Sequence, residues 1–345
     1  MPDNPLREPP APPAPLRPEE VEAGWLGPEP FLRGTAWLDR GRAVRADPDD
    51  LARLPWDTVE RAALPIGVRV EFTAAPGTRS VELRYRTASP GPLPHCFALW
   101  RGTRCLGEVV TDPAEEATVA LPLPTGGGVF SVHPPEDRAP VVLGLRAVGG
   151  SLAPAPRRRR WLVHGDSITE GWWSTRPALS WPATAGRTLG LDTVNLGYAG
   201  GARGELPLAE QLARLPGEVV TLAFGTNCWS AAPCSAGWLY ETVRAYVGLV
   251  RRGHPDAPLL ILSPVLRPEA ETTPNALGAT LEDLRAAMEH AGRDLAAEGD
   301  ERLLVLSGRP LLGPEHLADG LHPDDAGHAR IAAAVADALR PHVRA

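Results

Sequence analysis

The sequence predicts two domains of different architecture, an antiparallel, jelly-roll-like β-sandwich followed by a three-layer α/β domain with a parallel sheet. Between residues 31 and 150, apolar residues alternate with polar ones. From residue 161 onward, short apolar runs alternate with longer segments of helical pattern. A period of two is typical of half-buried strands, and strands that alternate with helices are typical of a parallel sheet.

The composition is that of a folded, acidic protein. The 345 residues are 43% hydrophobic, and the formal net charge is -7. All 35 basic residues are arginine, scattered among 42 acidic residues, so we expect no nucleic-acid partner. The four cysteines form no C-x-x-C pair, and we expect free thiols and no zinc site.

Residues 1–30 are predicted to form a proline-rich N-terminal arm. This stretch has no apolar core of a signal peptide and no run long enough to cross a membrane. We therefore expect a cytoplasmic protein that does not bind membranes. Within the arm and just after it, Trp25 and Phe31 are candidates to dock onto the folded body.

Residues 31–150 are assigned to the β-sandwich, with proline- and glycine-rich turns between its strands. Trp37 and Trp100 can stack on a sugar, but such aromatic residues more often belong to a core or a domain interface. The apolar positions that mark the expected strands lie at 68–72, 81–85, 119–121, 129–132 and 141–145.

Residues 151–160, which include four consecutive arginines, are predicted to form a semi-rigid, solvated linker. Residues 161–345 are assigned to the α/β domain. Its expected strands lie at 161–163, 193–196, 219–224, 259–262 and 303–306. Its expected helices lie at 182–189, 206–215, 236–250, 277–297 and 324–339.

Short polar motifs stand where strands of this domain end. They are Gly165-Asp166-Ser167 after the first strand, Asn195 to Gly201 after the second, Gly225-Thr226-Asn227-Cys228 after the third, and Asp319-Gly320-Leu321-His322 before the last helix. Ligands of parallel sheets bind at the carboxyl ends of the strands. Each motif alone is explained as a cap or a turn, but together they favour a catalytic site.

Taken together, these motifs resemble those of the SGNH or GDSL superfamily of serine esterases and acyltransferases, over residues 160–341. The resemblance implies a flavodoxin-like domain in which Ser167 is the nucleophile and Asp319 and His322 complete the catalytic triad. It also implies an oxyanion hole made by Ser167, Gly200 and Asn227. The chemistry agrees, because a serine hydroxyl needs a base to take its proton and the base needs an orienting partner.

Two features qualify the resemblance. Cys228 stands where the family commonly has Asp, which puts the local hydrogen bonds in question, although no histidine is placed to activate this thiol. His164 is expected to be packed rather than catalytic. Four tryptophans near the motifs are candidates for the substrate pocket, some of them expected to be core instead: Trp172, Trp173, Trp181 and Trp229.

The sequence therefore predicts a serine esterase that cleaves a carboxylic ester of a small molecule or glycoside and requires no cofactor or metal. Acyl transfer to a small-molecule alcohol is the second hypothesis, and carbohydrate deacetylation is the third. The order of the two domains resembles that of enzymes with these activities. A non-catalytic binding protein is the competing class, while the acyl group, the alcohol and the oligomeric state stay open.

Overall fold

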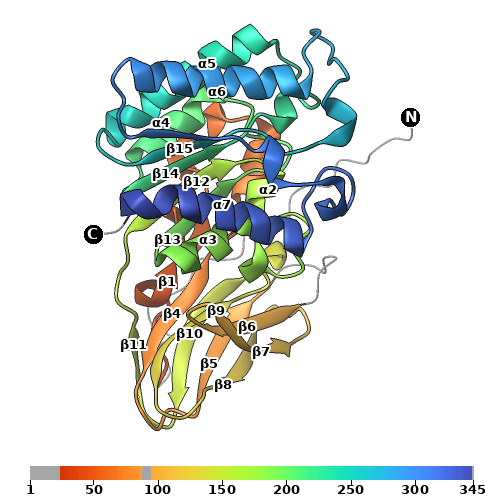
Figure 1. Ribbon diagram of the computed structural model, residues 1–345. Helices are drawn as coiled ribbons and strands as arrows, with labels where there is room; N and C mark the ends of the chain where they lie inside the picture. The colour runs from red at the N-terminus through yellow and green to blue at the C-terminus, as the bar shows by residue number, and fades with distance from the viewer. Residues whose placement is uncertain (1–23, 88–94, 344–345) are drawn as a thin grey trace.

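The computed structural model describes residues 24–87 and 95–343. Most of the predicted arm, residues 1–23, lies outside the described residues. In Figure 1 the β-sandwich forms the lower part of the molecule and the α/β layers form the upper part. Within the described ranges, no helix is long and apolar enough to cross a bilayer.

A parallel sheet forms the centre of the C-terminal half. Its strands follow the order β13-β12-β14-β15-β16, which in chain order is the 2-1-3-4-5 arrangement of flavodoxin-like folds. The predicted three-layer α/β fold is confirmed. The strands are β12 (Arg160–Gly165), β13 (Asp192–Gly197), β14 (Val219–Ala223), β15 (Leu259–Leu262) and β16 (Leu303–Leu306).

Helices cover both faces of this sheet (Figure 1). Leu162 and Leu222 pack in a core with α4, α5 and α6, whereas Trp161 and Val163 pack in a second core with α3 and α7. Because water reaches neither face, these strands consist of almost continuous apolar runs. The helices are α2 (Ser167–Glu170), α3 (Trp181–Leu189), α4 (Leu206–Arg214), α5 (Ala236–Gly253), α6 (Leu281–Ala297) and α7 (Asp325–Val343).

The N-terminal half contains the predicted antiparallel β-sandwich. One sheet has the order β1-β4-β9-β6-β7, with β11 also paired to β4, and the other has the order β10-β5-β8. Apolar side chains of both sheets, such as Phe72 and Leu83, share one core. The strands are β1 (Leu32–Arg33), β4 (Arg69–Ala74), β5 (Ser80–Arg86), β6 (Cys96–Arg101), β7 (Arg104–Val110), β8 (Ala117–Pro122), β9 (Gly128–His133), β10 (Val141–Val148) and β11 (Leu152–Pro154).

One part of the predicted sandwich packs elsewhere. The segment from Ala36 to Ala62 contains β2 (Trp37–Asp39), β3 (Arg42–Val44) and α1 (Trp56–Ala62). Its apolar side chains, including Leu54, join the core formed by α4, α5 and α6. The sequence division at residues 30 and 150 stays a prediction, but packing joins this segment to the α/β domain.

The stretch 151–160 is held more firmly than a solvated linker. β11 pairs with β4 of the sandwich, and Arg33 donates a hydrogen bond to the Ala155 carbonyl. Arg158 forms an ion pair with the buried Glu71. The buried Glu71 carboxylate requires a cationic partner, and Arg158 supplies it. The charge of the arginine run is therefore partly neutralised within the fold.

The aromatic residues singled out in the sandwich region lie in cores and interfaces. Phe31 is buried in the sandwich core, and Arg146 lies 4.7 Å over the ring of Trp25. Trp37 packs against the α/β core, and Arg187 of α3 lies 4.3 Å over the ring of Trp100. Trp100 and Trp37 thus serve the domain interface.

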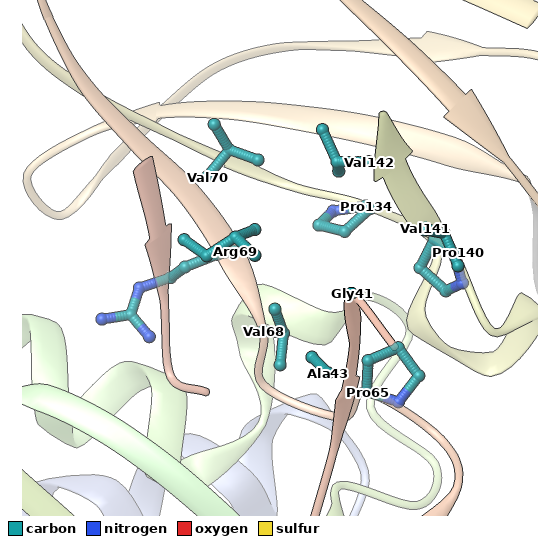
Figure 2. A pocket seen from close by; sticks show the side chains of 11 residues that line it. Gly41, Ala43, Pro65, Val68, Arg69, Val70, Pro134, Pro140, Val141 and Val142 are labelled. Carbon is teal, nitrogen blue, oxygen red and sulfur yellow. The ribbon is translucent and has the colours of Figure 1, made fainter. Parts of the chain in front are cut away.

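A small apolar cavity lies between the sandwich and the β2–β3 hairpin (Figure 2). Its volume of about 20 Å³ has room for roughly one water molecule. Val68, Val70, Pro134 and Val142 are among the residues that line it. None of the motif residues lines this cavity, because the motifs lie at the carboxyl ends of the parallel strands.

Candidate active site

Ser167 lies at a sharp turn between β12 and α2. Gly165 has no room for a side chain, because a Cβ there would lie 2.1 Å from Thr169 Oγ1. The Asp166 carboxylate accepts a 3.0 Å hydrogen bond from the Ile168 N–H and caps the helix. The Gly-Asp-Ser sequence therefore holds the Ser167 hydroxyl at the carboxyl end of the sheet.

Ser167, His322 and Asp319 form a hydrogen-bonded chain. Ser167 Oγ lies 2.9 Å from His322 Nε2, and Asp319 Oδ2 lies 2.7 Å from His322 Nδ1. With the proton on Nδ1, the ring donates to the carboxylate and Nε2 accepts the hydroxyl hydrogen of serine. Ser167 and His322 are each 8% exposed, so the pair is reachable from solvent but largely sheltered.

The Asp319 carboxylate is held on the loop before α7. Its Oδ1 accepts hydrogen bonds from the backbone N–H groups of Leu321 (3.0 Å) and His322 (2.7 Å). Burial alone raises the pKa of Asp319, but these bonds and the one from the His322 ring outweigh burial and lower the pKa to about 2. Asp319 is therefore ionised at neutral pH and can orient the imidazole.

Gly200 and Asn227 lie on loops that follow β13 and β14, the two neighbours of β12 in the sheet. The Asn227 amide donates a 2.7 Å hydrogen bond to the Gly201 carbonyl and keeps a second N–H for another acceptor. Gly200 has a φ of +74°, which favours glycine. Across the described residues, no hydrogen bond uses the backbone N–H of Ser167 or Gly200. These N–H groups can bind a substrate oxygen.

The sequence profile of the GDSL-like lipase/acylhydrolase family matches residues 163–330, the region that holds all of these motifs. Residues 163–330 form a GDSL-like lipase/acylhydrolase domain. This region brings together a sheltered serine, an imidazole, an ionised carboxylate and unpaired N–H donors. Such an arrangement is suited to acyl transfer through a covalent intermediate. No curated protein matches the chain in sequence.

Solved structures share the fold of both halves. A salicylyl-acyltransferase, SsfX3, from a tetracycline biosynthetic pathway has a TM-score of 0.81 at 23% identity, covering 92% of this chain and 97% of that chain. A protein from Bacteroides ovatus named as a GDSL-like lipase has a TM-score of 0.74 at 19% identity, with coverages of 92% and 97%. A family two carbohydrate esterase from Clostridium thermocellum has a TM-score of 0.61 at 17% identity, with coverages of 79% and 90%.

The candidate pocket tryptophans differ in their surroundings within the GDSL region. The ring of Trp172, 43% exposed, lies 5.3 Å from the His322 ring. Trp173 is exposed, and Trp229 donates a 2.8 Å hydrogen bond to the carbonyl of Thr273. Trp181 is fully buried in the α3–α7 core. Trp172 is therefore the candidate that lies against His322, while pocket roles for Trp172, Trp173 and Trp229 stay predictions.

Cys228 and His164 are both buried side chains with structural partners. The Cys228 thiol lies 3.6 Å from the Arg203 carbonyl oxygen. A hydrogen bond with Cys234, together with burial, raises the pKa of the Cys228 thiol, which disfavours the nucleophilic thiolate. His164 lies against Tyr246 with its Nδ1 3.1 Å from the Leu196 carbonyl oxygen. It is a core residue.

The sequence reasoning missed two residues that support the GDSL site. His328 of α7 is buried, and its Nε2 lies 2.9 Å from the carbonyl oxygen of Trp172. Glu170, which stands inside the first motif, is a buried carboxylate that binds several parts of the site. The position of Glu170 inside the first motif was a signal for this residue, but nothing in the local pattern around His328 indicated its contact.

The buried Asp166 gives a prediction for stability against pH. Burial raises its pKa to about 6, and hydrogen bonds from the N–H groups of Ile168 and Thr169 offset this only in part. Since its pKa is raised above the unfolded value, the protonated form favours folding, and this contribution is lost as the pH rises through 6. Asp166→Asn keeps a cap oxygen but cannot ionise. Between pH 4 and pH 7, we expect the free energy of unfolding of the variant to rise relative to that of wild type by up to about 3 kcal/mol.

Urea unfolding of both proteins at several pH values between 4 and 7 measures this difference. Asp337→Asn is the matched control, because it neutralises a side chain that is 76% exposed and paired only at the surface with Arg340, and it should change stability far less than Asp166→Asn. Parallel curves for wild type and Asp166→Asn would contradict the assignment.

Proposed function

We propose that this protein is a serine esterase that forms an acyl-enzyme on Ser167. In the first step, Ser167 Oγ attacks the ester carbonyl while His322 takes the hydroxyl proton through Nε2. Asp319 keeps the other ring nitrogen protonated and stabilises the imidazolium that forms. The observation that carries the proposal is the continuous hydrogen-bonded chain from Ser167 Oγ through the His322 ring to Asp319, at 2.9 Å and 2.7 Å.

The negative oxygen of the tetrahedral intermediate would be bound by the N–H groups of Ser167 and Gly200 and by the Asn227 amide. Such donors stabilise the transition state more than the ground state, because the oxygen becomes charged only there. Collapse of the intermediate breaks the ester bond, and His322 gives its proton to the leaving alcohol. Water, activated by the same histidine, then attacks the acyl-enzyme and releases the acid and the free serine.

A direct test is the capture of the acyl-enzyme. Mixing the protein with p-nitrophenyl acetate and quenching it in acid within the first turnover should add one acetyl group to the peptide that contains Ser167. Ser167→Ala should remain unmodified, and an acid-trapped acetyl group on any other residue would reject this nucleophile.

Acyl transfer to a small-molecule alcohol is the second candidate. It is supported by the shelter of the nucleophile, since Ser167 and His322 are each 8% exposed and the Trp172 ring lies 5.3 Å from the His322 ring. A site that partly excludes water lets a bound acceptor hydroxyl compete through its high effective concentration. The overall likeness to a salicylyl-acyltransferase agrees with this candidate, and the carbohydrate esterases keep polysaccharide deacetylation as a third.

The partition between water and acceptor separates the first two candidates. For an esterase, sugar or polyphenol acceptors should leave acid release from p-nitrophenyl acetate unchanged and should yield no new ester by mass spectrometry. A new ester that depends on Ser167 and forms faster than free acid would replace hydrolysis by acyl transfer as the main activity.

A further inference from the structure

Glu170 is a buried carboxylate next to the catalytic serine that the proposed mechanism does not use. It ends helix α2, three residues after Ser167, and is 3% exposed. Arg61 forms an ion pair with it through Nη2 and approaches Oε2 to 3.3 Å through Nε. Arg45 Nη2 lies 3.6 Å from Oε2. A buried carboxylate destabilises the fold unless it is paired, so these arginines permit Glu170 to occupy this position.

Glu170 binds two parts of the site with the same carboxylate. Oε2 accepts a 2.8 Å hydrogen bond from the N–H of Ala199, the residue directly before the candidate oxyanion donor Gly200. Oε1 accepts a 3.3 Å hydrogen bond from Trp172 Nε1, and Arg61 lies 5.7 Å over the ring of Trp172. The carboxylate thus connects the Gly200 loop with the aromatic ring that lies against His322.

The arginines come from the segment Ala36 to Ala62, outside the sequence motifs. Arg61 lies on α1 and Arg45 just after β3. Arg45 also donates to the carbonyls of Gly197 and Arg61, and its own carbonyl accepts a 2.6 Å hydrogen bond from the Tyr198 hydroxyl. Residues 197–199 are therefore held by hydrogen bonds with both this segment and Glu170.

We propose that Arg61 and Glu170 are positioning residues whose ion pair sets the place of the Gly200 N–H and of the Trp172 ring relative to Ser167. The segment Ala36 to Ala62 then belongs to the working active site of the GDSL region. Neither residue touches the reacting atoms. The expected effect on kcat rests on the proposed function. The expected effect on the order of residues 198–203 does not, because it can be measured without substrate.

The test uses Arg61→Gln, with Arg61→Lys as the conservative variant. We expect Arg61→Gln to lower kcat for p-nitrophenyl acetate by roughly 10- to 100-fold with little change in KM, because a small misplacement of donors affects the transition state most. Arg61→Lys should recover most of kcat. In hydrogen exchange, peptides that cover residues 198–203 should exchange faster in Arg61→Gln than in wild type.

Two control variants separate positioning from general destabilisation. Arg53, in the same segment, forms an exposed pair with Glu210, and Arg53→Gln should leave kcat and loop exchange unchanged. Arg69 forms a buried ion pair with Asp192 at the amino end of β13, whereas the candidate site lies at the carboxyl ends of the strands. Arg69→Gln should lower the melting temperature while the folded enzyme keeps wild-type kcat.

The outcomes are distinct. Wild-type kcat and wild-type exchange in Arg61→Gln would overturn the inference while the esterase proposal stands. An equal loss of kcat in Arg69→Gln would also overturn it, because the effect would then follow stability. If the wild type shows no Ser167-dependent turnover, the proposed function fails, and the exchange of residues 198–203 alone decides whether Arg61 orders the loop.

Discussion

Ser167→Ala should abolish ester hydrolysis, with kcat for p-nitrophenyl acetate and butyrate falling by roughly 10⁴- to 10⁶-fold. The variant removes the hydroxyl that is proposed to form the covalent bond to the acyl carbon. His322 and Asp319 would remain in place, but the base would have no hydroxyl proton to take. The fold should be kept, because the substitution removes a single small hydroxyl group whose hydrogen bond is to the His322 side chain.

Ser174→Ala is the matched control for that experiment. Ser174 is also a buried serine, in the stretch that follows α2, but its hydroxyl lies 2.8 Å from the Gly171 carbonyl oxygen and 3.2 Å from that of Arg176 and contacts no histidine. It should keep activity within a few-fold of wild type. Equal hydrolysis rates for wild type and Ser167→Ala would favour the competing class, a non-catalytic binding protein whose apparent activity comes from a contaminant.

Asn227→Ala should lower kcat by roughly 10²- to 10³-fold and leave KM nearly unchanged. In the proposed mechanism the Asn227 amide binds an oxygen that becomes fully charged only in the transition state, so its loss should affect turnover more than binding. Asn227→Asp makes a sharper version, because it keeps the size of the side chain, removes both N–H donors and places a negative charge toward the oxyanion. We expect it to be at least as slow.

Asn227 also connects two loops through its 2.7 Å hydrogen bond to the Gly201 carbonyl. The loss of this structural bond must therefore be distinguished from the loss of an oxyanion donor. Asn275→Ala provides the comparison. The Asn275 amide donates a 2.9 Å hydrogen bond to the Cys234 carbonyl and stabilises the neighbouring loop without any link to Gly201. Its loss should change kcat only a few-fold, and an unchanged kcat in Asn227→Ala would remove Asn227 from the oxyanion hole.

The secondary structure of the α/β half was predictable because its signals are local. The apolar runs at 259–262 and 303–306 coincide with β15 and β16. Helix α6 begins at Leu281 and not at 277, because Thr280 and Asp283 form a capping box that fixes its first turn. In the sandwich, β7 was missed, since this exposed edge strand has no alternation of apolar side chains.

The sequence by itself determined which side chains are available for chemistry. Asp319 and His322 lie three residues apart, so one loop can bring the carboxylate to the ring, and Gly165 and Asp166 shape the turn that carries Ser167. Each of these arrangements involves residues that are close together in the chain, so the residues of one motif are enough to determine it. The same is true of the alternating periods that distinguish the two halves.

Only the tertiary structure decided what those side chains meet. Ser167 and His322 are 155 positions apart and come together because β12 lies between β13 and β14 in the sheet while α7 packs beneath it. The pairing of Arg61 with Glu170 joins segments 109 positions apart, and no local pattern specifies it. Such contacts follow from which apolar surfaces bury one another, a property of the whole packed core that short-range patterns do not contain.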